Sequence, residues 1–434
     1  MPTLNKIRAA LPRSLRGTRT PGSPAGAQLA RLRTVLTIFF ALDGFVFAGW
    51  VVRIPDIKDQ TGASPSALGL ALLGVSAGGV ATMVLTGGLI RRYGAHAVTV
   101  GTAVLLSAGV VLPPLTRSAL ALGLVLLVFG AAFGSINVAM NSAAVDLVAA
   151  MRRPILPSFH AAFSLGGMLG AGLGALVAGH LSPTRHLLLL ALLGLAVTVF
   201  AGRALLALPV PKPPPGPGAA DRPRAKPGVE PGIEPGTEPT AAELPAGRVR
   251  LLVAVLGLVA LCTAYGEGAM ADWSALHLKE SLDAGPGLAA AGYSVFALAM
   301  TAGRLSGTAL LLRLGQNRAL VAGGATACVG MLLGSFSPSV WGALAGFALT
   351  GLGLANIFPI AIGRAGELAG PNGVAAASTL GYGGMLLGPP AIGFLADWFS
   401  LRAALSTVAL LAGAASVIAY AMQAVQHGGR PRRG

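Results

Sequence analysis

Two carboxylates, Asp43 and Glu267, stand inside long apolar stretches of the sequence. Placing an ionisable side chain in such surroundings costs roughly 2.5 kcal/mol or more, so it needs a partner, water or a task. Each carboxylate could exchange a proton or bind a cationic or hydroxylated ligand. The alternative is a structural hydrogen bond to a neighbouring segment. Trp50 and Trp273 follow them by about two helical turns, so we expect both carboxylates at nearly matching depth.

Amide side chains form a second group of candidates. Asn137 and Asn141 are spaced by one helical turn and therefore share a helix face. On that face they could hydrogen-bond a polar substrate or simply join two helices, and the sequence favours neither reading. Asn356 lies in a comparable segment later in the chain and has the same two readings.

Arg304 is the one basic residue well inside an apolar segment. It could anchor an anionic group, but a structural ion pair is the expected role, with Asp146 as a possible partner. Cys262 and Cys328 lie in apolar stretches, and no Cys/His group has metal-ligand spacing, so neither disulfides nor a metal site is expected. Without a P-loop or a convergent nucleophile and base, the sequence indicates neither an enzyme nor a cofactor.

The composition indicates what must position these side chains. Hydrophobic residues make up 54% of the 434 residues and charged residues 11%, with a mean hydropathy of +0.73. A soluble protein could not cover its surface with so little charge, so the apolar majority must face lipid or other helices. We expect an all-α membrane protein with twelve transmembrane helices. The expected spans are 33–53, 66–90, 96–115, 118–149, 155–181, 186–208, 250–274, 286–312, 317–335, 338–363, 372–396 and 401–424.

A polar segment rich in Pro and Gly divides the spans into two groups of six. It contains the repeat Pro-Gly-Val-Glu, Pro-Gly-Ile-Glu, Pro-Gly-Thr-Glu, which predicts a solvated linker and not a domain. The expected organisation is a basic tail, two six-helix bundles joined by the linker, and a second basic tail. Their bounds are 1–32, 33–208, 209–249, 250–424 and 425–434.

Lys and Arg residues predict the orientation in the membrane. Most of them fall in the two tails, the linker and alternate loops on the same side of the membrane, and few fall in the other loops. Both termini are therefore expected in the cytoplasm. The formal charge of +16 does not predict nucleic-acid binding, because the basic residues form no stripe between aromatic residues. The expected macromolecular surroundings are the lipid bilayer alone.

The two halves resemble each other in sequence. Gly166-Gly167 and Gly383-Gly384 open similar stretches, each followed by Met and Leu. Asn137 pairs in the same way with Asn356, Gly94 with Gly315, and Trp50 with Trp273, and the spacing between partners shrinks smoothly along the chain. This pattern predicts two pseudo-symmetric six-helix bundles with a binding site between them.

The loop after the second span, Gly87–Gly94, reads Gly-Gly-Leu-Ile-Arg-Arg-Tyr-Gly and resembles the corresponding loop of the major facilitator superfamily. Arg91 stands where that family usually has an acid, so the contact made by that acid is not expected. The segments 138–141, 153–167 and 267–275 resemble a narrower branch, bacterial inner-membrane proteins related to fucose permease.

The resemblance implies a secondary transporter that moves a small molecule by alternating access. We expect a monomer in the bacterial inner membrane, with coupling to protons left open. The carboxylates that carry protons in fucose permease are replaced by Val51 and Asn137, so that pathway does not transfer. Uptake of a sugar or another small polar metabolite and broad export of amphipathic compounds are alternatives. A non-transporting sensor and a membrane enzyme fit less well.

Overall fold

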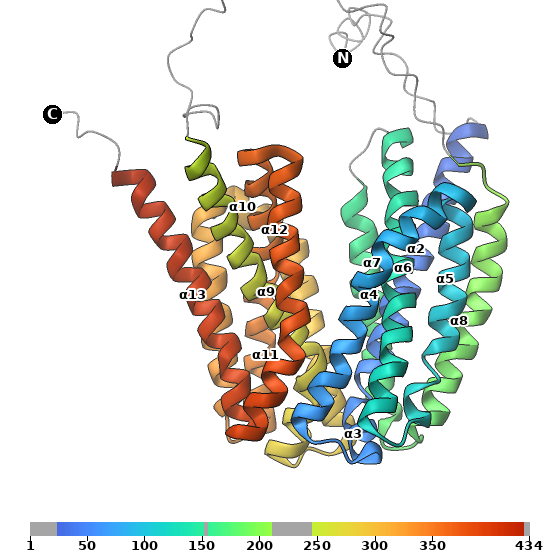
Figure 1. The fold of residues 1–434 in the computed structure, drawn as a ribbon, viewed down its shortest axis with the longest axis horizontal. Helices are drawn as coiled ribbons and strands as arrows, with labels where there is room; N and C mark the ends of the chain where they lie inside the picture. The colour runs from blue at the N-terminus through green and yellow to red at the C-terminus, as the bar shows by residue number, and fades with distance from the viewer. Residues whose placement is uncertain (1–23, 152–154, 211–244, 429–434) are drawn as a thin grey trace, which may run out of the picture.

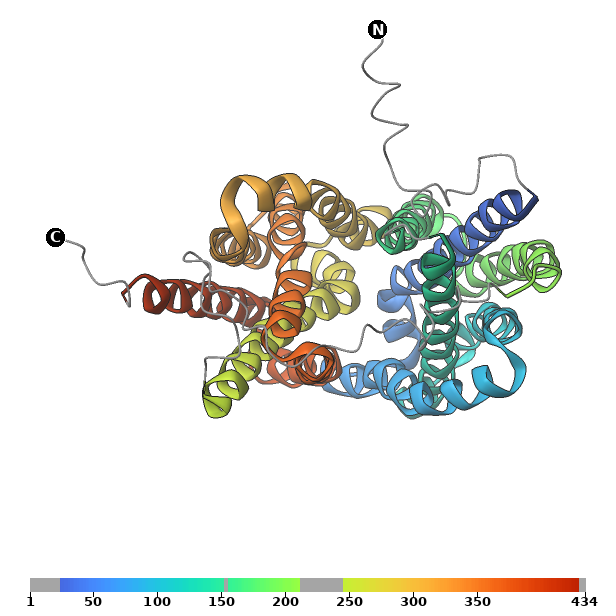
Figure 2. The same cartoon turned by 90° about the horizontal axis from the view of Figure 1, so that it is seen from above.

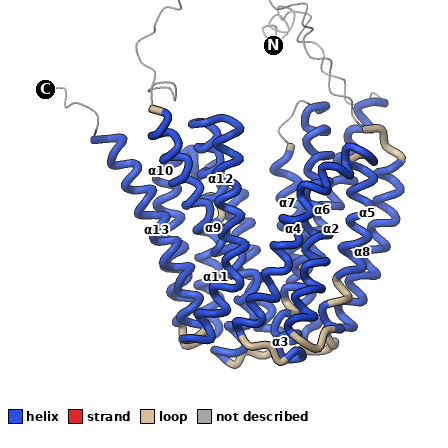
Figure 3. The backbone as a smooth tube through the Cα atoms, in the orientation of Figure 1, coloured by secondary structure: helices blue, strands red, loops and turns tan. Residues whose placement is uncertain are grey.

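A computed structural model describes residues 24–151, 155–210 and 245–428. Within these ranges the regular elements are helices, with no strand (Figure 3). The expected tails and linker lie largely outside the described residues. Where parts of them are described, at 24–32, 246–249 and 425–428, the chain is helical. The neighbouring helices are therefore longer than hydropathy alone predicts.

The first half of the chain forms the N-terminal bundle. Its elements are α2 (Pro24–Val51), α3 (Ile54–Thr61), α4 (Pro65–Tyr93), α5 (Ala95–Gly109), the 3-10 turn η2 (Pro113–Leu115), α6 (Ala119–Met151), α7 (Leu156–Ala178) and α8 (Pro183–Leu206). The six long helices match the six expected spans, whereas the short α3 was not expected.

Serine and proline set where α4 and α8 begin. The hydroxyl of Ser64 accepts a hydrogen bond from the backbone N–H of Ala67 at 3.2 Å, and Pro65 follows it. Ser182 caps α8 in the same way, 3.4 Å from the N–H of Arg185. Proline is suited to the first helical position because its missing N–H would be unpaired there anyway.

The second half forms the C-terminal bundle. Its helices are α9 (Ala246–Leu282), α10 (Pro286–Phe336), α11 (Val340–Leu354), α12 (Ile357–Trp398) and α13 (Leu401–Gly428). Gly315, with φ of 74°, divides α10 at the boundary expected between two spans. Ala369 and Gly370 divide α12 in the same way.

The expected span 338–363 agrees with the membrane-length stretch Val340–Gly370, although its helix is broken at Asn356, between α11 and α12. Another expectation for this bundle needs correction. Eleven stretches of the described chain are long and apolar enough to cross a membrane, and the expected span 372–396 is not among them. That segment is helical to Trp398, but its many Gly, Pro, Ser and Thr residues lower its mean hydropathy.

The two bundles lie side by side and approach each other at one end (Figures 1 and 2). They draw together at the end where α3 lies and spread apart toward the end where α2 begins and α13 ends (Figure 1). At the joined end α4 packs on α12, with Gly69 against the Pro389 carbonyl and Gly393 against that of Pro65. α7 packs on α10, where Ala171 and Ala290 share a small apolar cluster.

The internal repeat expected from the sequence is present in the packing, but its register is shifted by one residue: Gly166 corresponds to Gly384 and not to Gly383. A Cβ atom at Gly166 of α7 would lie 1.9 Å from the Ala41 carbonyl oxygen of α2. In the other bundle, a Cβ at Gly384 of α12 would lie 2.2 Å from the Leu261 carbonyl oxygen of α9. The same close helix contact, made possible by a missing side chain, therefore occurs once in each half.

The outer surface of both bundles carries large apolar side chains. Leu120, Leu176 and Leu312 are 75%, 74% and 84% exposed. In water such side chains would favour aggregation, whereas hydrocarbon accommodates them at no cost. The exposed leucines agree with a multi-pass membrane protein whose helices satisfy their backbone groups internally.

Candidate functional site

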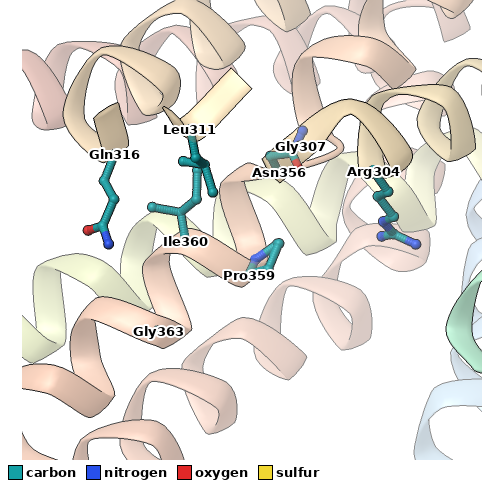
Figure 4. Close-up of a pocket in the computed structure, with 8 residues that line it drawn as sticks. All are labelled: Arg304, Gly307, Leu311, Gln316, Asn356, Pro359, Ile360 and Gly363. Carbon is teal, nitrogen blue, oxygen red and sulfur yellow. The ribbon is translucent and has the colours of Figure 1, made fainter. Parts of the chain in front are cut away.

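A cavity of about 320 Å³ lies in the C-terminal bundle between α10 and α12 (Figure 4). Its polar walls come from Arg304 and Gln316 of α10 and from Asn356, the residue that precedes α12. The remaining lining residues are Gly307, Leu311, Pro359, Ile360 and Gly363. Its size falls at the lower end of the range for small-molecule pockets.

Arg304 is paired with Glu267 of α9. The Arg304 Nη2 atom donates to both carboxylate oxygens of Glu267, at 3.1 and 3.2 Å. The two side chains are 38% and 25% exposed, so the pair is neither buried nor free in solvent. Asp146 was a possible partner for Arg304 in the sequence, and this is wrong: Glu267 takes that place.

Asn356 is held in position by α10. Its Nδ2 atom donates to the backbone carbonyl of Gly303 at 2.9 Å. A Cβ atom at Gly307 would lie 2.2 Å from the Asn356 Oδ1 atom, so a side chain there would displace the amide from this position. The interrupted helix and the missing side chain together bring this amide to the wall of the cavity.

Asp43 lies in the N-terminal bundle and is fully buried. The Asn137 Nδ2 atom of α6 donates to its Oδ2 atom at 2.9 Å. The other carboxylate oxygen, Oδ1, is buried and has no hydrogen-bond partner in the described part of the chain. Asn137 therefore joins α2 to α6, and Asn141 donates at 2.8 Å to the Asn137 carbonyl of its own helix.

The two carboxylates have different surroundings. Asp43 is enclosed within one bundle, whereas Glu267 is bound to a cation on the other. The repeated glycine contacts align Phe45 with Tyr265, because Gly170 lies against Phe45 and Gly388 against Tyr265. In that register Glu267 lies one helical turn beyond the counterpart of Asp43, so the expected match in depth is only approximate.

His160 is an exposed residue of α7 in the N-terminal bundle. Its ring packs edge-on against Phe40, with the ring centroids 5.6 Å apart. It lies within electrostatic range of Arg304 in the opposite bundle. The space near Arg304 is therefore approached from both halves of the molecule.

Charged residues at the joined end form a group that the sequence did not reveal. Lys58 Nζ lies 2.5 Å from Glu280 Oε1, and Lys279 Nζ lies 2.5 Å from Asp59 Oδ2. Each pair joins α3 of one bundle to α9 of the other, and we call these four residues the α3 latch. The sequence does not reveal these ion pairs because their partners are far apart along the chain, and only the fold brings α3 and α9 together.

Across residues 24–151, 155–210 and 245–428, no three His, Cys, Asp or Glu side chains lie together as a ligand group.

Comparison with known proteins places this arrangement in a family. Residues 34–378 match the model of the Major Facilitator Superfamily. An uncharacterised MFS-type transporter of Yersinia pestis is 34% identical over 88% of this chain and 92% of its own length. An uncharacterised transporter of Sinorhizobium fredii is 30% identical over 88% of this chain and 95% of its own.

A solved structure shares the fold. A bacterial homologue of the human lysosomal transporter Spinster, in an inward-facing and unoccupied conformation, superposes with a TM-score of 0.71. It is 12% identical and covers 94% of this chain and 99% of its own. The two-bundle fold agrees with the match to the family model and with these relatives. The chain belongs to the major facilitator superfamily, and it is a membrane transporter and not an enzyme.

Proposed function

We propose that the protein is a secondary transporter that carries a small polar molecule across the bacterial inner membrane by alternating access. The main support is the asymmetry of the two bundles, which are joined by the α3 latch at one end and spread apart at the other. Rocking of the halves about a central site would exchange the open and the closed end. The cavity lining is mostly apolar, and Arg304, Gln316 and Asn356 supply three polar groups that could bind a polar cargo.

The orientation follows from the positive-inside rule, with both termini in the cytoplasm. In that orientation the spread end faces the cytoplasm, and the conformation is inward-facing. We expect an impermeant maleimide to label Asp283→Cys, in the loop between α9 and α10, on intact cells. Thr237→Cys in the linker should react only after permeabilisation. Both variants need a background without Cys262 and Cys328, and labelling of Thr237→Cys from outside would reverse the topology.

Proton coupling is the proposed source of energy, with Asp43 as the carrier. A buried carboxyl with one unpartnered oxygen can take up and release a proton without losing its bond to Asn137. The protein is proposed to act as a monomer, since one chain supplies both bundles.

Purified protein in liposomes tests the transport activity. A stability screen against sugars, metabolites and antibiotics would find a ligand first, because a molecule that binds only the folded state raises its melting temperature. Saturable uptake of that ligand into liposomes is the expected result. Chemical conversion of the ligand without a vesicle would contradict the proposal.

The α3 latch supplies a test of alternating access. Lys58→Glu or Glu280→Lys alone places like charges together, and Ala290→Cys reports whether the bundles have parted because Ala290 is 1% exposed at their contact. Exposed ion pairs contribute about 0.2–1 kcal/mol. Each reversal should therefore raise the rate of labelling from outside by roughly two- to fivefold.

The double variant Lys58→Glu/Glu280→Lys restores opposite charges and should return the slow rate. Arg117→Glu, an exposed basic residue outside the latch, is the matched control and should leave the rate unchanged. Equal rates in all variants would mean that the latch does not hold the bundles together.

A further inference from the structure

Glu267 binds Arg304 but does not use all of the N–H donors of its guanidinium group. A guanidinium group has five N–H donors. Glu267 occupies only the Nη2 atom, with both carboxylate oxygens on that one nitrogen. Among the described residues nothing accepts from the Nε or Nη1 atom of Arg304. Three N–H donors of a fixed cation therefore remain available at the edge of the cavity.

The geometry of the pair is also not the strongest one. Arginine binds a carboxylate best through two parallel N–H···O bonds from two nitrogens. Here both bonds come from one nitrogen, so a carboxylate that met two nitrogens would be bound better than Glu267 is. Because the Arg304 side chain is 38% exposed, such a carboxylate could reach it.

Two amide side chains, Asn356 and Gln316, stand on the otherwise apolar walls of the cavity and can bind hydroxyl groups. The Asn356 amide donates to Gly303, which fixes it, while its Oδ1 atom can accept a hydrogen bond. Gln316 is exposed and lies at the opposite end of the lining from Arg304 in Figure 4. Among the described residues no acidic side chain lines the cavity, and Arg304 is its one ionisable lining residue. An anionic group at Arg304 and hydroxyl groups along the amides would match these walls.

The geometry points to a cargo that is a small hydroxylated carboxylate, which binds Arg304 in exchange for Glu267. In the empty carrier Glu267 neutralises Arg304; when the cargo arrives, its carboxylate takes over that role and Glu267 is released. His160, on the opposite bundle, lies within electrostatic range of Arg304 but does not line the cavity. This inference rests on the proposed transport function and names its substrate class.

Competition between Glu267 and a soluble carboxylate is measurable on the full-length purified protein. The probes are acetate, lactate and gluconate, with sorbitol as the match for gluconate because it has the same six-carbon polyol chain without the carboxylate. The readout is the melting temperature as a function of probe concentration. A ligand that binds the folded state must raise it.

Glu267→Gln should bind the carboxylates better than the natural protein, because the competing charge is gone while Arg304 stays. The concentration of gluconate needed for half of the effect should fall severalfold. Arg304→Gln should lose the response. Since that variant leaves Glu267 without its cation, the double variant Glu267→Gln/Arg304→Gln keeps the pair neutral and should also lose it. Arg318→Gln, on the same helix but outside the lining, is the control and should respond normally.

The order of responses decides the proposal. If none of the three carboxylates stabilises Glu267→Gln more than sorbitol does, Arg304 is not an anion site and the pair is a fixed structural bridge. If the double variant still responds like the natural protein, the carboxylates bind elsewhere, and the proposal is wrong as well.

Liposome uptake separates this inference from the transport function. Saturable uptake of a neutral or cationic compound that persists in Arg304→Gln would support the transport function and contradict the anionic cargo. Carboxylate binding that depends on Arg304, without uptake of any bound compound, would support the anion site and contradict the transport function.

Discussion

Replacing Asp43 with asparagine should abolish transport driven by a pH gradient while exchange of ligand across the membrane continues. Asparagine has the shape of aspartate, and its Oδ1 atom can still accept from Asn137, so α2 and α6 stay joined. Its amide cannot take up or release a proton. If Asp43 carries the coupled proton, the gradient can no longer drive the cycle, but the bundles can still rock with ligand bound.

The measurement uses liposomes with the ligand found by the stability screen, once with a pH gradient and once with unlabelled ligand inside. Asp283→Asn is the matched control. Asp283 is exposed and has a φ of 51°, a conformation that asparagine tolerates, so the same chemical change should have no effect there. Full gradient-driven uptake by Asp43→Asn would exclude Asp43 as the proton carrier.

Replacing Gly166 with alanine should destabilise the N-terminal bundle. The added Cβ would lie 1.9 Å from the Ala41 carbonyl oxygen, and neither backbone can yield without moving α7 away from α2. Overpacking of this kind costs about 1–3 kcal/mol or more. The melting temperature in detergent and the fraction of monodisperse protein should both fall.

Gly172 supplies the control on the same helix, because a Cβ there meets nothing within 4 Å. Gly172→Ala should be neutral or slightly stabilising, since alanine favours a helix more than glycine does. The repeat predicts the same contrast in the other bundle, with Gly384→Ala harmful and Gly383→Ala mild. Equal melting temperatures for Gly166→Ala and Gly172→Ala would show that α2 and α7 can separate freely.

Hydropathy predicts the fold well because every helix that crosses the lipid must be apolar over about 20 residues and must satisfy its own backbone hydrogen bonds. The sequence pair Gly94 and Gly315 was expected to be equivalent, and both glycines have positive φ, 85° and 74°. The break at Asn356 lies one turn before Pro359, which has no N–H to donate to the preceding turn, so the sequence does indicate it. The hydrogen bond from Asn356 to Gly303 of another helix was not predictable.

The candidate site was predicted only in part. Asp43, Asn137, Glu267 and Arg304 were recognised because charged and amide groups are costly in apolar segments. Their partners were not, because depth along a helix does not say which neighbour a side chain faces. Arg304 was assigned to Asp146 as a possible partner, yet Glu267 on the adjacent α9 is bonded to it. The α3 latch was missed for the same reason.

Arg53 follows α2, and in the sequence it appears to be only a basic residue of an outer loop. In the structure its side chain is fully buried. Its nitrogens donate to His186 Nδ1 at 2.9 Å, to Asp56 Oδ2 at 2.9 Å and to the carbonyls of Ala178 and Leu181. All of these partners belong to the N-terminal bundle, so Arg53 fastens the α2–α3 corner to the ends of α7 and α8.

Such a corner cannot swing independently. α3 is therefore expected to move as a rigid part of the whole N-terminal bundle, without a hinge of its own. Arg53 binds the α2–α3 corner to the ends of α7 and α8. If the Lys58–Glu280 pair separates, these helices therefore move together with α3, and the entire bundle must tilt at once. If the two bundles part at the end that carries α3, that end would therefore open in one cooperative step, without a state in which α3 alone has moved.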